Sequence, residues 1–232
     1  MKLPDKSEVR RWLALRRKKV ADDGHIIISG TGRSGTTLLV QLFTHLGFDT
    51  GFDRKTSLSS VDRISHAGLE RSLREDELPY IVKSPWFVDE VDEVLRDGSK
   101  TIRAAIVPVR DLVEAAESRR RVWREATRQR LDPLRHPGTI WKTEEPAEQE
   151  NVLAVQFYKV VNALVAHEIP VYLLSFPRFA QDGRYFYRTL RPIFKMHQVP
   201  RDDVLQEHKR IVKTRLIHDF TQSSIGLSHP GG

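Results

Sequence analysis

The chain has 232 residues, and its 38 Lys and Arg against 31 Asp and Glu give a formal net charge of +7. Its 10 Phe, 4 Trp and 5 Tyr supply core material, which excludes a wholly disordered chain. No stretch approaches the ~20 apolar residues of a membrane span. The absence of Cys excludes disulfides, thiolate metal sites and cysteine nucleophiles.

Residues 1–22 have the pattern of a basic amphipathic helix and lack the apolar core of a secretory signal. We expect this helix to pack on the domain as a basic flank, with a membrane-surface or nucleic-acid role as the alternative. The lack of both a signal and Cys favours a cytoplasmic protein. Residues 223–232 are expected to form a flexible tail.

Short apolar runs alternate with stretches of helical apolar spacing along the rest of the chain. The runs predict strands at residues 25–29, 80–83, 101–109 and 170–174. The helical stretches are residues 36–46, 60–74, 87–95, 112–130, 147–168, 184–196 and 202–215. Strands separated by helices predict a single α/β domain over residues 1–232, with a P-loop-type parallel β-sheet flanked by helices on both faces.

The strongest signal is a glycine-rich turn between the first predicted strand and the first predicted helix. It consists of Gly30, Thr31, Gly32, Arg33, Ser34, Gly35, Thr36 and Thr37. Glycines allow several backbone N–H groups to converge on one point, and the helix N-terminus adds free donors and its positive dipole end. The turn is therefore predicted to cradle a phosphate-like group.

The spacing of this turn is close to the P-loop pattern G-x-x-x-x-G-K-[ST]. Gly30 and Gly35 meet that pattern, but Thr36 stands in the place of the Lys. Kinases and ATPases use that Lys on the β- and γ-phosphates, so we do not expect the triphosphate of ATP here. A P-loop kinase, with Asp111 as its candidate metal-binding carboxylate, is one alternative. A non-catalytic polyanion- or nucleotide-binding module is the other.

A loop with an internal cation followed by Ser-Gly-Thr-Thr resembles the 5′-phosphosulfate loop of the sulfotransferase superfamily, whose donor is 3′-phosphoadenosine 5′-phosphosulfate (PAPS). In that family a strand-end Arg and a Ser eight residues later hold the 3′-phosphate, and Arg110 and Ser118 match this spacing. The specific motifs cover about residues 25–120, with a weaker likeness over residues 170–195. The glycine-rich C-terminal nucleotide loop of the cytosolic members is not recognisable.

The resemblance also implies catalytic roles. Lys83, at the end of the second predicted strand, would act with Arg33 on the charge that develops on the sulfuryl group and the leaving phosphate. Pro85 stands where members acting on small hydroxyl compounds have a catalytic His. Members acting on carbohydrate or protein acceptors use a carboxylate, for which Asp53 is the best-placed candidate and Asp49 the second.

The arginine-rich stretch, the net charge and the His residues bear on the possible partners and metals. The arginine-rich stretch after Ser118 can attract an acidic nucleotide or acceptor, whereas the modest net charge argues against a nucleic-acid partner. The His residues show no metal-binding spacing, so no metal is predicted. The resemblance thus implies transfer of a sulfuryl group from PAPS, with PAP as product, to a hydroxyl or amine of a small-molecule, lipid or carbohydrate acceptor. We expect no stable membrane insertion, and the oligomeric state has no signal in the sequence.

Overall fold

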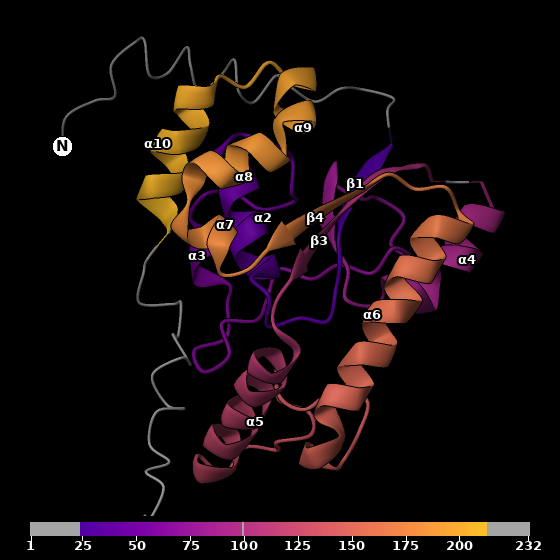
Figure 1. The fold of residues 1–232 in the computed structure, drawn as a ribbon, viewed down its shortest axis with the longest axis vertical. Coiled ribbons are helices and arrows are strands. Elements are labelled where there is room, and N and C mark those ends of the chain that lie inside the picture. The colour runs from indigo at the N-terminus through magenta and orange to yellow at the C-terminus, as the bar shows by residue number, and fades with distance from the viewer. Residues whose placement is uncertain (1–23, 99, 213–232) are drawn as a thin grey trace, which may run out of the picture.

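Four parallel strands form one sheet in the order β2-β1-β3-β4 (Figure 1). The strands are β1 (His25–Ile28), β2 (Ile81–Lys83), β3 (Ile102–Val109) and β4 (Val171–Ser175). The computed structural model describes residues 24–98 and 100–212, so the predicted helix over residues 1–22 and the predicted tail lie outside the described residues. Parallel neighbours require crossover connections, and helices supply them here. The predicted α/β class and parallel sheet are confirmed.

Helices cover both faces of the sheet (Figure 1). One face carries α2 (Thr36–His45), α7 (Arg178–Gln181), α8 (Gly183–Thr189), α9 (Arg191–Met196) and α10 (Arg201–Ile211), with the short α3 (Thr56–Ser59) against α2. The other face carries α4 (Phe87–Arg96) and α6 (Gln149–Ala166). A short 3-10 helix, η1 (Pro146–Glu148), directly precedes α6. Helix α5 (Leu112–Arg128) follows β3 and packs on α6.

Strand β1 is buried on both faces, which explains its continuous apolar run. Ile26 and Ile28 point into one core, together with Phe43 of α2. Ile27 points into the second core, together with Phe87 of α4. Such two-sided burial is typical of the central strands of a parallel sheet. The sheet thereby holds the glycine-rich turn at the carboxyl end of a rigid strand.

The predicted helix over residues 60–74 is wrong. That region contains turns, bends and irregular chain after α3. The Asp62 carboxylate accepts hydrogen bonds from the backbone N–H groups of Ile64 and Ser65 at 3.0 and 2.6 Å. A side chain that satisfies nearby backbone donors in this way competes with helix formation. The charged pattern of the segment is therefore that of a polar loop beside the site.

The predicted helix over residues 184–196 is divided into α8 and α9. Pro192 lies in the first turn of α9, where its missing N–H is harmless. The same residue cannot donate the bond that would continue α8.

Among the described residues, no helix is long and apolar enough to cross a lipid bilayer.

Candidate anion-binding site

The turn between β1 and α2 has the backbone shape of an anion cradle. Gly30, Gly32, Arg33 and Gly35 all have positive φ angles, of 140°, 71°, 56° and 85°. Backbone N–H groups in such a left-handed run face a common concave side. A Cβ on Gly35 would lie 2.8 Å from ring atoms of Phe176 and Phe179, so only glycine fits at this position.

Three buried serine hydroxyls surround this turn. Ser34 lies within it, Ser29 follows β1 directly, and Ser84 follows β2 directly. None of the three has a hydrogen-bond partner among the described residues. A buried hydroxyl without a partner costs about 1–3 kcal/mol, so this cluster is suited to a ligand or water that supplies acceptors. The residues present therefore fit an oxyanion.

Arg33 connects the turn to α5 and to the loop after α3. Its Nε donates to Ser118 Oγ at 3.0 Å, and its Nη1 donates to the carbonyl oxygen of Ser65. Arg110 Nη1 donates to the Arg33 carbonyl oxygen at 3.1 Å. Burial, followed by the nearby Arg121 and Arg110 guanidinium groups, lowers the pKa of Arg33 to about 10. The structure thus brings Arg33, Arg110 and Ser118 together.

A second buried arginine, Arg119, forms a hydrogen bond to the backbone of the turn. Arg119 donates to the carbonyl oxygens of Thr31 and Thr139, both at 2.6 Å, and its guanidinium lies 5.2 Å from the Trp141 ring centroid. Burial and then the charge of Arg33 lower its pKa to about 9. Sequence reasoning placed Arg119 in a general basic run and missed this role. Its position directly after Ser118 was the available signal.

Within the described part of the chain, Arg33 and Arg119 lack carboxylate partners. No described Asp or Glu lies within salt-bridge distance of either guanidinium. Two buried cations that depend on neutral acceptors are electrostatically costly. A bound anion at the turn would compensate both charges, which is the electrostatic argument for a binding site here.

Lys83 lies beside the first turn of α2 with 6% of its side chain exposed. Its Nζ donates to Thr37 Oγ1 at 2.8 Å, to the Gly68 carbonyl oxygen at 2.7 Å and to Glu70 Oε1 at 2.7 Å. Burial lowers the Lys83 pKa, and Glu70 opposes that effect. Sequence reasoning missed Glu70, because it lay within the predicted helix over residues 60–74.

The Asp53 side chain bonds to nearby backbone groups at the start of α3. Its Oδ1 accepts hydrogen bonds from the backbone N–H groups of Lys55 and Thr56, both at 2.8 Å, at the start of α3. These bonds, the one from Thr56 foremost, lower the pKa of Asp53. The side chain is exposed, and its hydrogen bonds stay within residues 53–56. Asp49 similarly accepts from Gly51 N at 3.1 Å.

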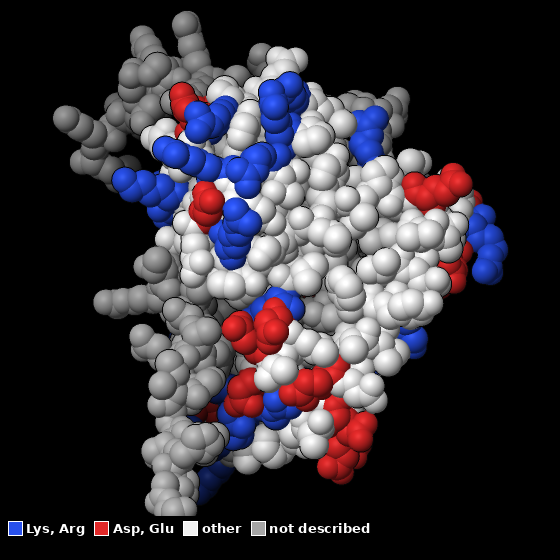
Figure 2. Space-filling view, viewed as in Figure 1, with Lys and Arg blue, Asp and Glu red and all other residues white. Residues whose placement is uncertain are grey.

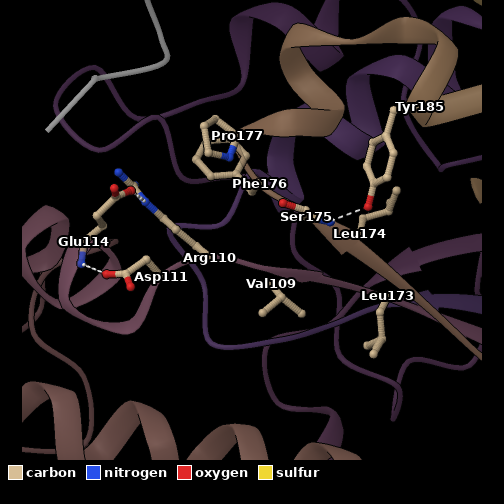
Figure 3. A pocket seen from close by; sticks show the side chains of 10 residues that line it. All are labelled: Val109, Arg110, Asp111, Glu114, Leu173, Leu174, Ser175, Phe176, Pro177 and Tyr185. Carbon is tan, nitrogen blue, oxygen red and sulfur yellow. Dashed lines mark hydrogen bonds and ion pairs between the residues drawn. The ribbon is translucent and has the colours of Figure 1, made fainter. Parts of the chain in front are cut away.

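A cavity of about 590 Å³ opens at the carboxyl ends of β3 and β4 (Figure 3). Arg110, which directly follows β3, lines it, and Phe176 and Tyr185 contribute aromatic walls. The Arg110 guanidinium lies 5.3 Å from the Phe176 ring centroid, and its Nε lies 3.2 Å from Glu114 Oε2. Because Phe176 also packs against Gly35, the cavity adjoins the glycine-rich turn. Its volume suits a small organic ligand.

Within residues 24–98 and 100–212, no group of His, Asp and Glu is arranged to hold a metal ion. The chain matches no family model, no curated protein and no solved structure at a significant level. The function is therefore inferred from the motifs and the geometry of the site.

Proposed function

We propose that this protein is a PAPS-dependent sulfotransferase that transfers a sulfuryl group to a hydroxyl or amine of a small-molecule, lipid or carbohydrate acceptor. The observation that carries the proposal is the convergence of Arg33, Arg110, Ser118 and Lys83 on one glycine-rich turn. These are the residues that the sequence resemblance assigns to the donor. They come from the turn itself, the connection between β3 and α5, helix α5 and strand β2, so their meeting is a tertiary property.

The donor would lie across the carboxyl ends of β1 and β3. The N–H groups of residues 30–37 would hold the 5′-phosphosulfate, with Arg33 beside it. Arg110 would hold the 3′-phosphate, for which its guanidinium has a bidentate donor geometry. Phe176 would offer a ring face to the adenine in the adjoining cavity. The described buried serine hydroxyls without a partner, those of Ser29, Ser34 and Ser84, lie in the turn or directly after β1 and β2.

The reaction is an in-line attack of the acceptor oxygen or nitrogen on the donor's sulfur. The new bond forms to sulfur as the bond between sulfur and the 5′-phosphate oxygen breaks. Lys83, Arg33 and the N–H groups of the turn stabilise the charge that moves to the sulfuryl and phosphate oxygens. Lys83 must exchange at least one of its three present acceptors for such an oxygen.

Glu70 is the carboxylate best placed to take the acceptor's proton. It lies 2.7 Å from Lys83 Nζ, whereas the Asp53 carboxylate accepts hydrogen bonds from the Lys55 and Thr56 N–H groups and its pKa is lowered. A general base must lie within reach of the reacting group, and this favours Glu70 on geometry. Its partly exposed side chain also faces solvent, from which an acceptor can approach.

Glu70→Gln is expected to lower kcat by about 10²-fold or more, because an amide cannot accept the proton. The amide oxygen can still accept the Lys83 hydrogen bond, so the fold should be retained. Asp53→Asn is the matched control and should keep near-normal turnover. Steady-state rates with excess PAPS test both variants. Normal turnover in Glu70→Gln, or a comparable loss in Asp53→Asn, would contradict this assignment.

The proposal as a whole is tested by thermal shift with PAP, using ADP, AMP and ATP–Mg²⁺ as comparisons. A ligand at 100 times its Kd stabilises a protein by about 2.7 kcal/mol, which is a rise of several degrees in Tm. We expect this shift with PAP, its loss in Arg110→Ala, and its retention in the exposed-arginine control Arg128→Ala. No shift with any nucleotide would contradict donor binding.

The two alternatives are separated by the same titration. A P-loop kinase would respond to ATP–Mg²⁺ alone. Against that reading, Thr36 replaces the P-loop Lys, and Asp111 Oδ1 is engaged as the N-cap of α5, accepting from Glu114 N at 3.0 Å. A non-catalytic polyanion-binding module would bind PAP and show no turnover with any acceptor.

A further inference from the structure

The Asp62 carboxylate joins two loops that are far apart in the sequence. Its Oδ1 accepts from the Ser65 N–H at 2.6 Å and from the Ser65 hydroxyl at 2.7 Å. His136 Nε2, from the loop between α5 and η1, lies 3.1 Å from the same oxygen. Burial opposes ionisation of Asp62, but the Ser65 bonds and His136 lower its pKa, so the carboxylate accepts and His136 donates. The loops also pack closely, since a Cβ on Gly138 would lie 2.7 Å from Ser65 Cβ.

The loop that carries Asp62 is held in one conformation by its own hydrogen bonds. The Asp62 N–H donates to the Ala67 carbonyl oxygen at 2.7 Å, and the His66 N–H donates to the Asp62 carbonyl oxygen at 2.9 Å. The Ala67 N–H donates to the Ser65 hydroxyl at 3.1 Å. His66 adopts a left-handed conformation with φ 54°. These bonds fix the position of the Ser65 carbonyl group.

The Ser65 carbonyl oxygen is one of two acceptors that hold the Arg33 guanidinium. Arg33 Nη1 donates to this oxygen, and Arg33 Nε donates to Ser118 Oγ at 3.0 Å. Among the described residues, Arg33 Nη2 has no hydrogen-bond partner. A guanidinium is planar, so two bonded nitrogens also fix the third. Nη2 therefore remains available to a bound oxyanion.

Asp62 also acts on the charge of Arg33. Figure 2 shows Asp and Glu side chains mixed with Lys and Arg around α5, where Arg120 Nη2 lies 2.5 Å from Glu150 Oε1. Arg33 forms no such pair with a described carboxylate. Burial and then the Arg121 and Arg110 guanidinium groups lower its pKa, and Asp62 opposes this effect. Asp62 thus stabilises the Arg33 charge without occupying its N–H groups.

The loop that carries His136 is itself bonded to the glycine-rich turn. The His136 carbonyl oxygen accepts from Thr139 Oγ1 at 2.9 Å, and the Thr139 carbonyl oxygen accepts from Arg119 at 2.6 Å. Arg119 also donates to the Thr31 carbonyl oxygen at 2.6 Å. The contact between Asp62 and His136 therefore closes a path of hydrogen bonds that begins and ends at the turn, at Thr31 and at Arg33.

We propose that Asp62 and His136 are positioning residues of the anion site. Together they hold the Ser65 carbonyl oxygen, so that Arg33 is fixed through Nε and Nη1 and keeps Nη2 available for an oxyanion at the turn. Neither residue needs to touch the ligand. A guanidinium that is already ordered loses less conformational freedom when the anion binds. The inference rests on the part of the proposed function that places an oxyanion at the turn.

The experiment is isothermal titration calorimetry of the full chain with PAP and with inorganic pyrophosphate, an oxyanion without a nucleoside. Asp62→Asn should raise both dissociation constants by about 10-fold, because the bonds to a charged acceptor are lost. His136→Ala should have a similar effect. His136→Gln should restore most of the affinity, because its amide N–H can donate to Asp62.

Asp92→Asn is the matched control. Asp92 of α4 forms a similar pair with His167, at 2.6 Å. His167 directly follows α6 and precedes β4, so this pair lies near the amino end of β4, away from the turn at the carboxyl end of β1. The variant should bind both ligands as the wild type does. The melting temperature of each variant is recorded beside its affinity.

A double-mutant cycle separates positioning from a general effect on the fold. Because Asp62 acts through Arg33, Asp62→Asn should change the affinity of Arg33→Ala by less than about 2-fold. Loss of fold stability alone would weaken binding by the same factor in both backgrounds. The two His136 variants decide the same question if Asp62→Asn does not fold.

Two outcomes overturn the inference while the proposed function stands. One is PAP binding by Asp62→Asn and His136→Ala with the affinity of the wild type. The other is a 10-fold loss from Asp62→Asn that persists in Arg33→Ala. Pyrophosphate binding with the expected cycle, but without PAP binding, would contradict the nucleotide donor and support the positioning role. A wild type that binds neither ligand would overturn both.

Discussion

Gly35→Ala is expected to lower the free energy of unfolding by about 2–5 kcal/mol and to abolish PAP binding. The left-handed conformation at φ 85° costs a residue with a Cβ about 1–2 kcal/mol. The added Cβ would also lie 2.8 Å from the rings of Phe176 and Phe179. Overpacking of this kind typically costs a further 1–3 kcal/mol or so. Both effects are large against a total stability of about 5–15 kcal/mol.

Gly98→Ala separates the two contributions. Gly98 has a similar φ of 67°, but a Cβ there would meet no atom of the described residues within 4 Å. It should therefore lose only the conformational part, about 1–2 kcal/mol, and should bind PAP normally. Urea denaturation of both variants measures the difference. Equal losses in the two variants would show that the packing of Phe176 and Phe179 on Gly35 is not tight.

Arg33→Ala is expected to lower kcat for sulfuryl transfer by about 10²-fold or more. The buried guanidinium would act on the charge that develops in the transition state, and removal of one such donor commonly has an effect of this size. Arg33→Lys should recover part of the rate, because it keeps the charge but not the bond from Nε to Ser118. The rates are measured at saturating PAPS.

Arg128→Ala is the control for a general loss of positive charge. Arg128 lies at the end of α5, its side chain is 75% exposed, and it pairs only loosely with Glu125 at 3.4 Å. This variant should keep near-normal turnover. Because Arg33 also bonds to Ser65 and Ser118, the melting temperature of Arg33→Ala must be recorded as well. A folded Arg33→Ala variant with near-normal turnover would contradict the proposed role.

The strands and the glycine-rich turn were predictable because their causes are local. A strand buried on both faces requires a continuous apolar run, as in residues 26–28. A turn with four positive φ angles favours glycine at those positions, and three of the four residues here are glycine. The turn can therefore be recognised from the sequence. The wrong helix over residues 60–74 has a local cause as well. There, the capacity of Asp62 to bond to Ile64 and Ser65 outweighs a helical charge pattern.

The assembly of the site was decided by tertiary structure. Arg33 and Ser118 are 85 positions apart in the sequence. Lys83 and Glu70 pair across the irregular segment that separates them, and the sequence of that segment has no periodic pattern that predicts the contact. Arg119 became a buried support of the turn because α5 starts at the carboxyl end of β3, next to β1. Contacts of this kind depend on which elements become neighbours, and propensity within one segment carries no information about that.

Strand β4, an edge strand of the sheet among the described residues, shows the same division. The apolar run at residues 170–174 predicts a strand, and the structure contains it as β4. Whether such a strand is central or at an edge depends on the strand order, which is set by the packing of helices on both faces of the sheet. The sequence by itself therefore determined the α/β class, the strands and the glycine-rich turn, since these follow from burial and backbone conformation along short segments. Only the tertiary structure decided the partners of Arg33, Arg119 and Lys83 and the exposure of Val171 and Leu173, because these arise between segments distant in the chain.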